Sequence, residues 1–243
     1  MRGLALAVLV LAGCGCTIAD RKALVEKTER EQKLERLEGL SAATASLDSR
    51  YDCEWNAAMI CAELADESTE KLDSSRRKDF AKLGMAHADK AIKLQPERVE
   101  GHYYKCMTLG RYLELSYPEP ILVADLRDEG ERTARIDVEG KFEHAGAHRF
   151  LGVFYYMTPE TGPWGYGRQD KADEHFTRML ELEPRYPENQ YEYGKYQLWA
   201  DSKEDARDAF KKCLDCLNHP DVSPAVREHL REGATEYLKK LGN

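Results

Sequence analysis

The sequence predicts an all-α protein in which helical hairpins stack into a superhelix, and three observations support this prediction. Charged residues make up 33% of the 243 residues and hydrophobic residues 42%, a balance typical of helices with one solvent-facing side. Small and aromatic residues recur at fixed offsets before three turn-forming residues. Beyond residue 50 the apolar positions follow the period of a helix. We expect extra helices at the N-terminus and a capping helix at the C-terminus.

Residues 1–13 predict a lipoprotein signal peptide, because a positive start precedes a continuous apolar run over residues 4–12. The four residues Leu11-Ala12-Gly13-Cys14 resemble a bacterial lipobox. This resemblance implies cleavage before Cys14 and acyl chains on its thiol and amine, which together suffice for stable membrane anchoring. No Asp follows Cys14, which favours the outer membrane, with the protein facing the periplasm. Ordinary secretion, with Cys14 and Cys16 as spare thiols, is the alternative.

Residues 14–40 are predicted to hold the lipidated cysteine and a charged tether, since residues 26–33 contain no apolar side chain. The folded domain is predicted over residues 41–243. After the first twenty residues, no uncharged apolar stretch approaches the roughly 18 residues that a membrane-spanning helix needs. The membrane contact is therefore expected through the lipid anchor alone.

The repeat becomes visible when Pro96, Pro184 and Asn218 are aligned. Twelve, eight and five residues upstream lie small or aromatic side chains: Gly84, Ala88 and Ala91; Ala172 and Phe176; Ala206, Phe210 and Cys213. Two opening helices carry Leu151-Gly152 and Tyr193-Gly194 at equivalent places. Small residues let the two helices of a hairpin approach closely, and the aromatic fills the groove beside them.

This pattern resembles the tetratricopeptide repeat (TPR), which spans about 34 residues. The register fits without a gap from Pro187 to Asp221, whereas the unit around residues 42–97 matches only in its second half. Ser223-Pro224 predicts the start of a capping helix, with an N-cap followed by Pro at the first helical position. One face of that helix is expected to hold Val226, Leu230, Tyr237, Leu238 and Leu241.

The cysteines favour a structural role. The CxxC of Cys213 and Cys216, with His219 nearby, invites a redox or metal interpretation, but it lies late in a helix and no second ligand pair follows. We expect structural thiols or one local disulfide, and no metal site. Six cysteines after Cys14 allow fifteen full pairings, and the sequence does not choose among them.

Enzyme and nucleic-acid functions find little support. A net charge of −8 lacks the basic footprint that a nucleic-acid backbone requires. His144 and His148 have the i, i+4 spacing of a metal-binding helix, but Ala145 replaces the catalytic Glu of such motifs. Gly165-Tyr166-Gly167 is only a fragment of a dinucleotide-binding motif. We therefore predict a protein that is not an enzyme and carries no cofactor.

The order of these features is similar to that of one family. A lipoprotein signal, degenerate TPR units, the segment over residues 146–152 and a Pro-Trp-Gly loop resemble the T-component (TatT-like) lipoproteins of tripartite ATP-independent periplasmic (TRAP) transporters. The resemblance implies engagement of the transporter's soluble solute-binding protein and transfer of small ligands. Two other hypotheses stay open: a scaffold of an outer-membrane or pilus assembly complex, and a redox or metal-handling lipoprotein. Homo-oligomerisation is compatible with the first hypothesis, although no residue requires it.

The TPR resemblance also implies which residues face a partner or ligand, because the first helix of each hairpin lines the concave surface. The candidates are Tyr103, Arg149, Tyr156, Tyr191 and Lys195. Arg offers a planar fork for a carboxylate, and Tyr offers apolar area with a polar tip. Trp164, in a loop rich in glycine, either gates a cavity, inserts into a partner or covers the gap between helices. The alternative for each candidate is an ordinary solvated surface residue.

Overall fold

The computed structural model describes residues 31–40, 47–66, 73–116, 119–163 and 165–242, and the regular structure in these ranges is α-helical. A helix over residues 31–40 precedes the labelled elements. The helices that follow are α3 (Leu47–Asp66), α4 (Ser74–Leu94), α5 (Val99–Glu114), α6 (Pro120–Ile136), α7 (Gly146–Met157), α8 (Gln169–Leu182), α9 (Pro187–Trp199), α10 (Lys203–Asp215) and α11 (Pro224–Leu241). The prediction of an all-α stack is confirmed.

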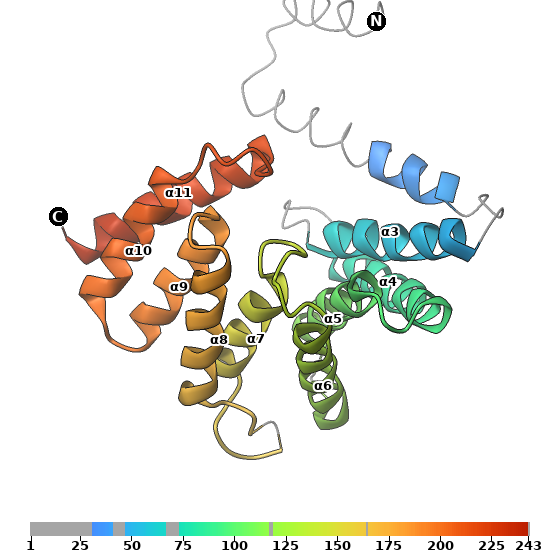
Figure 1. The fold of residues 1–243 in the computed structure, drawn as a ribbon, viewed down its shortest axis with the longest axis horizontal. Coiled ribbons are helices and arrows are strands. Elements are labelled where there is room, and N and C mark those ends of the chain that lie inside the picture. The colour runs from blue at the N-terminus through green and yellow to red at the C-terminus, as the bar shows by residue number, and fades with distance from the viewer. Residues whose placement is uncertain (1–30, 41–46, 67–72, 117–118, 164, 243) are drawn as a thin grey trace, which may run out of the picture.

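Consecutive helices pack as antiparallel hairpins, which follow one another in an arc (Figure 1). The pairs α3–α4 and α5–α6 form one side of the arc, α7–α8 lies at its centre, and α9–α10 with α11 forms the other side. The α5–α6 pair lacks the small–aromatic–Pro pattern, so the repeat seen in the sequence describes the hairpins on either side of it.

The predicted close approach of small and aromatic residues is present in two hairpins. A Cβ on Gly152 would lie 2.9 Å from the ring of Phe176, and a Cβ on Gly194 would lie 2.8 Å from Phe210. Both rings are fully buried. Hydrogen in place of a side chain therefore sets the spacing between the helices of each hairpin, and the two hairpins repeat one packing solution.

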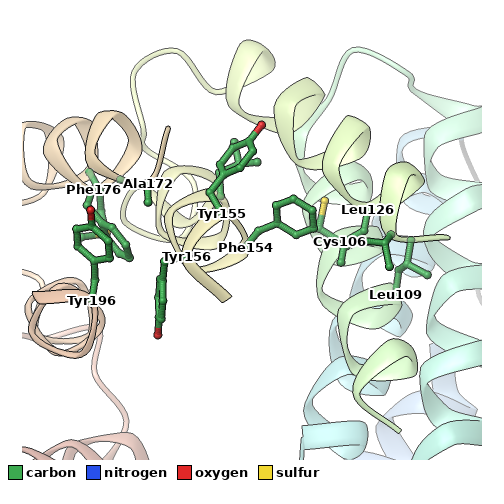
Figure 2. Packing of buried hydrophobic residues seen from close by; sticks show 13 residues of the cluster. Cys106, Leu109, Leu126, Phe154, Tyr155, Tyr156, Ala172, Phe176 and Tyr196 are labelled. Carbon is green, nitrogen blue, oxygen red and sulfur yellow. The ribbon is translucent and has the colours of Figure 1, made fainter. Parts of the chain in front are cut away.

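Helix α7 connects the two sides of the core (Figure 2). Phe154 points toward Cys106 and Leu126 of the α5–α6 pair, whereas the Tyr156 ring centroid lies 6.1 Å from that of Phe176 on α8 and 5.6 Å from that of Tyr196 on α9. Because neighbouring positions on one helix pack on opposite sides, a single apolar cluster runs from α5 to α9.

The C-terminal helix begins as predicted. Ser223 is the N-cap, its hydroxyl accepts a hydrogen bond from the Val226 amide at 3.3 Å, and Pro224 occupies the first turn. Leu230 is buried, and the remaining predicted apolar residues beyond it pack partly against the same cluster. Val226 is 39% exposed, so the prediction that it lies on the packed face is wrong.

The N-terminal predictions fall mostly outside the described residues, including the signal peptide, Cys14 and Cys16. Within the predicted tether, residues 31–40 are helical and place Leu37 against Ile60 and Leu64 of α3. No helix in the described ranges is long and apolar enough to cross a membrane. The five cysteines in those ranges are free thiols, and burial raises the pKa of Cys213 to about 12, as suits a structural thiol.

Candidate interaction site at the centre of the stack

The chain makes an unusual left-handed turn between α6 and α7. Glu143, His144 and Ala145 have φ values of 49°, 52° and 61°, although none of them is glycine. This conformation is unfavourable for L-residues by about 1–2 kcal/mol each, so the surrounding structure has to hold it. Asp137 begins this stabilisation, since its carboxylate accepts hydrogen bonds from the amides of Lys141 and Phe142, each at 3.1 Å.

Arg149 and Asn189 clamp the turn from α7 and α9. The Arg149 Nη1 donates to the carbonyls of Glu143 at 3.2 Å and His144 at 3.4 Å, and to Asn189 Oδ1 at 2.6 Å. Asn189 is fully buried, and its Nδ2 donates to the carbonyls of His144 at 3.0 Å and Glu183 at 3.1 Å. Two side chains from consecutive hairpins thus satisfy carbonyls that the left-handed turn leaves without helical partners.

Two tyrosines of helix α5 also contact the left-handed turn. A Cβ on Gly146 would lie 2.7 Å from the Tyr103 ring, so Tyr103 packs directly on the start of α7. Tyr104 donates a hydrogen bond to the Glu143 carboxylate at 2.8 Å. Burial, reinforced by that carboxylate, raises the pKa of Tyr104 well above its ordinary value. Side chains from the α5–α6, α7–α8 and α9–α10 hairpins therefore all contact the segment over residues 142–146.

Arg149 is 7% exposed, and its guanidinium faces one carboxylate. Its Nη2 lies 3.5 Å from Glu188 Oε2, and its Cζ lies 5.5 Å from the Tyr186 ring centroid. Burial by itself lowers the pKa of Arg149, but the Glu188 carboxylate outweighs it and the net pKa is raised. The guanidinium is therefore charged, and its Nη1 already donates to internal acceptors.

A second group of candidates lies on α7 and α9. Lys195 Nζ pairs with Glu192 at 2.8 Å and lies 5.4 Å above the Tyr191 ring. Tyr156 packs against Tyr196 and reaches Trp199 at a centroid distance of 5.8 Å. Trp199 is 48% exposed at the end of α9. This group joins aromatic area to a charged pair across two hairpins.

The structure places the predicted residues in two environments. Tyr103, Arg149, Tyr156 and Tyr191 are each at least nine-tenths buried, and Lys195 is partly exposed. Arg149 and Tyr103 meet at the left-handed turn, while Tyr191 and Lys195 meet on α9. Trp164 lies outside the described residues. The roles of these residues in partner binding stay predictions.

His144 and His148 do not share a helical face, because α7 begins only at Gly146. His144 stacks on Tyr186, with centroids 4.0 Å apart, whereas His148 Nδ1 lies 3.0 Å from His175 Nδ1. The sequence analysis missed Asn189 and the left-handed turn. No local signal marks them, since Asn189 acts on residues 45 positions away and the turn contains no glycine at its left-handed positions.

Comparison with known proteins identifies the class of fold. The chain is similar to the crystal structure of a thermophilic TPR protein from Thermus thermophilus, with a TM-score of 0.54 and 15% identity over 86% of this chain and 99% of that one. The fold is therefore TPR-like.

The assignment to a particular protein family has no such support. The chain matches no known family profile, and no curated protein matches it. Membership of the TatT-like family accordingly remains a prediction based on the sequence resemblance.

Proposed function

We propose that this protein is a TPR-type scaffold that binds a protein partner, held by lipid on Cys14 at a bacterial outer membrane and facing the periplasm. The observation that carries the proposal is the central clamp, where Arg149 binds Asn189 and the carbonyls of residues 143 and 144. Because its Nη1 donates to internal acceptors and its Nη2 faces Glu188, the guanidinium supports a rigid binding surface better than it supports capture of a small anion.

The exposed groups on α7 and α9 suit a protein partner. Met157 and Trp199, which end these two helices, are 66% and 48% exposed. Trp199 lies one helical turn beyond Lys195, which pairs with Glu192, and aromatic anchors of this kind supply most of the binding energy of interaction surfaces. We therefore expect the partner to contact the ends of α7 and α9.

A TRAP solute-binding protein is the second candidate partner. It is favoured by the resemblance over residues 146–152, the segment that contains Arg149. Ligand transfer would further require that a partner open the buried contacts of Tyr103 and Tyr156. Partner identity thus separates the transport role from the scaffold of an outer-membrane or pilus assembly complex.

Site-specific photo-crosslinking in the source cells tests the proposal. A photoreactive residue in place of Trp199 should give a discrete adduct, and one in place of Ile121 serves as the control because Ile121 is 68% exposed on α6. Mass spectrometry of the adduct then identifies a solute-binding protein or an assembly component. Identical adducts from both positions, or none from Trp199, contradict the proposed surface.

Fatty-acid labelling tests the anchor separately. We expect the wild type and Cys16→Ser to incorporate labelled acyl chains and Cys14→Ser to incorporate none. Labelling of Cys14→Ser at the wild-type level contradicts lipidation at Cys14. Because labelling does not involve α7 or α9, its outcome is independent of the partner experiment.

A further inference from the structure

Two histidines and an aspartate far apart in the sequence meet beside the left-handed turn. His144 comes from the turn, while His219 and Asp221 come from the loop between α10 and α11. One donor atom from each of the three lies within 4.8 Å of the others. His144 Nε2 is 3.3 Å from Asp221 Oδ2, and His219 Nδ1, which accepts a long hydrogen bond of 3.4 Å from the Asp221 amide, is 3.9 Å from the same oxygen.

We propose that His144, His219 and Asp221 form a zinc-binding site that clips the α6–α7 turn to the α10–α11 loop. Two imidazoles and one carboxylate form a donor set that suits zinc and similar transition metals, whereas calcium and magnesium prefer oxygen ligands. In a tetrahedral zinc site the ligand atoms lie about 2.0–2.2 Å from the metal, and hence about 3.3 Å from one another. The separation of His144 from Asp221 already has this value.

The two imidazoles are held in place by aromatic contacts. The His144 ring is stacked on Tyr186 at 4.0 Å with an interplanar angle of 17°. The His219 ring meets Tyr186 edge-on at 5.4 Å, and it lies 5.0 Å from the His144 ring. Tyr186 is buried, so it fixes both ligands from one side. Such support reduces the ordering that metal binding would otherwise require.

The backbone positions of the ligands are held as well. The His144 carbonyl accepts hydrogen bonds from Arg149 and Asn189, at 3.4 and 3.0 Å. In the α10–α11 loop, Arg227 donates to the carbonyls of Leu217 at 2.8 Å and Val222 at 3.2 Å, on either side of His219 and Asp221. The two chain segments that would share the metal are therefore both braced.

A carboxylate also stands behind the first histidine. Glu183 Oε2 lies 3.9 Å from His144 Nδ1, on the opposite side of the ring from Asp221. In metal sites the second imidazole nitrogen commonly faces a carboxylate, which orients the ring and leaves the other nitrogen to the metal. Glu183 can take this role with a small side-chain movement.

The site is open to solvent on the aspartate side. Asp221 is 62% exposed at its side chain, whereas the side chains of His144 and His219 are 22% and 21% exposed. A cation can enter without opening the core, and the exposed carboxylate can shift to shorten its distance to His219. Three protein ligands leave a fourth position of the tetrahedron, which water or a partner's side chain can fill.

Calorimetric titration of the metal-stripped full chain with zinc chloride, in detergent, tests the proposal. We expect one zinc per chain, at least about tenfold weaker binding in His219→Gln and His144→Asn, and a thermal midpoint that zinc raises less in these two variants than in the wild type. Asn tolerates the left-handed conformation at position 144, so the second variant removes the ligand with little backbone strain. Asp221→Asn alters only an exposed side chain, so it still tests the site if one of the histidine variants fails to fold.

Two matched controls separate this site from other zinc-binding groups. His229→Gln removes an unrelated histidine of α11, and Cys216→Ser removes the more accessible thiol of the CxxC; both should bind zinc like the wild type. Cobalt substitution should give a spectrum without a thiolate charge-transfer band. The proposal is overturned by the absence of saturable binding, by unchanged binding in all three ligand variants, or by loss of binding in Cys216→Ser alone.

Discussion

The two sides of the arc reach the same hairpin geometry with different chemistry. On the side formed by α3–α6, buried polar groups join the helices: His102, fully buried on α5, pairs with Glu129 on α6, and Tyr51 donates to Glu100 at 3.0 Å. From the centre to the other side, over α7–α11, stacked rings join the helices in addition to the Arg149–Asn189 pair: Phe176 stacks on Tyr196 at 4.8 Å and Phe210 on Tyr237 at 4.7 Å.

The difference explains why the repeat is visible in only part of the sequence. A ring against a glycine needs particular residue types at fixed offsets, and it therefore leaves a periodic pattern. A buried ion pair can be built from several residue types and from long side chains that reach across different offsets. The α5–α6 hairpin, whose helices are joined by the His102–Glu129 pair, consequently lacks the repeat, whereas α4 keeps the small residues Gly84, Ala88 and Ala91.

Removing a central ring should have the largest effect. Phe176→Ala leaves a cavity between α7, α8 and α9, and we expect the free energy of unfolding to fall by about 3–5 kcal/mol. Urea denaturation monitored by circular dichroism measures the change. Phe150→Ala, which removes a partly buried ring, should lose clearly less. Equal losses would mean that the aromatic stack has no special weight.

The buried pair on the polar side should come next. Burial alone raises the pKa of Glu129, but hydrogen bonding to His102 and the Lys105 ammonium outweigh it, so the net pKa is lowered. We expect Glu129→Gln to lower stability by about 1.5–3 kcal/mol. Glu114→Gln breaks an exposed pair with Arg111 and should change stability by less than about 0.5 kcal/mol. Similar urea midpoints for both variants would contradict the comparison.

A single methyl group tests the close approach directly. Gly194→Ala places its Cβ 2.8 Å from Phe210 and should destabilise by about 1–3 kcal/mol. Gly110→Ala is the matched control in α5, where nothing lies within 4 Å of the new Cβ, and it should stabilise by about 0.5–1 kcal/mol. The two substitutions therefore differ in sign, and thermal denaturation distinguishes them. Stabilisation by both substitutions would show that the structure around Gly194 accommodates the added methyl group at little cost.

Lowering the pH should destabilise the protein at His148 before it affects the Glu129 pair, and this is the smallest of the expected effects. Burial, aided by the charge of His175, lowers the pKa of His148 from 6.5 to about 4. A base with a lowered pKa in the folded state contributes its full stability above pH 6.5, and this stability is lost as the pH falls toward 4. For a partly exposed ring we expect a loss of about 1–2 kcal/mol, reduced by solvent screening.

The Glu129 pair should behave differently, since a carboxylate with a lowered pKa loses its contribution only below its ordinary pKa of 4.5. Urea midpoints of the wild type and His148→Gln between pH 7 and 4.5 measure the histidine part. The slope should flatten in the variant. An unchanged slope would assign the acid sensitivity to other groups.

The sequence predicted the elements that depend on local chemistry. The N-cap at Ser223 and the pairing of Gly152 with Phe176 follow from residue type and spacing, and both are confirmed. The α5–α6 hairpin has no signature of its own, so its pairing follows from packing between its neighbours. Val226 matched the period of α11, but it lies in the first turn of the helix and is 39% exposed, outside the cluster that it was expected to join.

The candidate site depends on contacts between distant segments, and these could not be predicted. Arg149 was chosen as a residue exposed on the concave face, yet Asn189 forty positions later accepts its hydrogen bond. His219 was considered together with Cys213 and Cys216, whereas its ring lies beside His144. Each of these relations involves the left-handed turn, which Asp137 and side chains of the neighbouring hairpins hold in place.

That turn has a mechanical consequence. A stack of hairpins behaves like a coil spring, in which small rotations between neighbouring units add up along the axis. Arg149 and Asn189 link the α7–α8 hairpin to the α9–α10 hairpin, and Tyr104 links the α5–α6 hairpin to the turn before α7. The stack should therefore be stiffest at the α7–α8 hairpin, and a force applied to its ends should bend mainly the hairpins on either side of α7–α8.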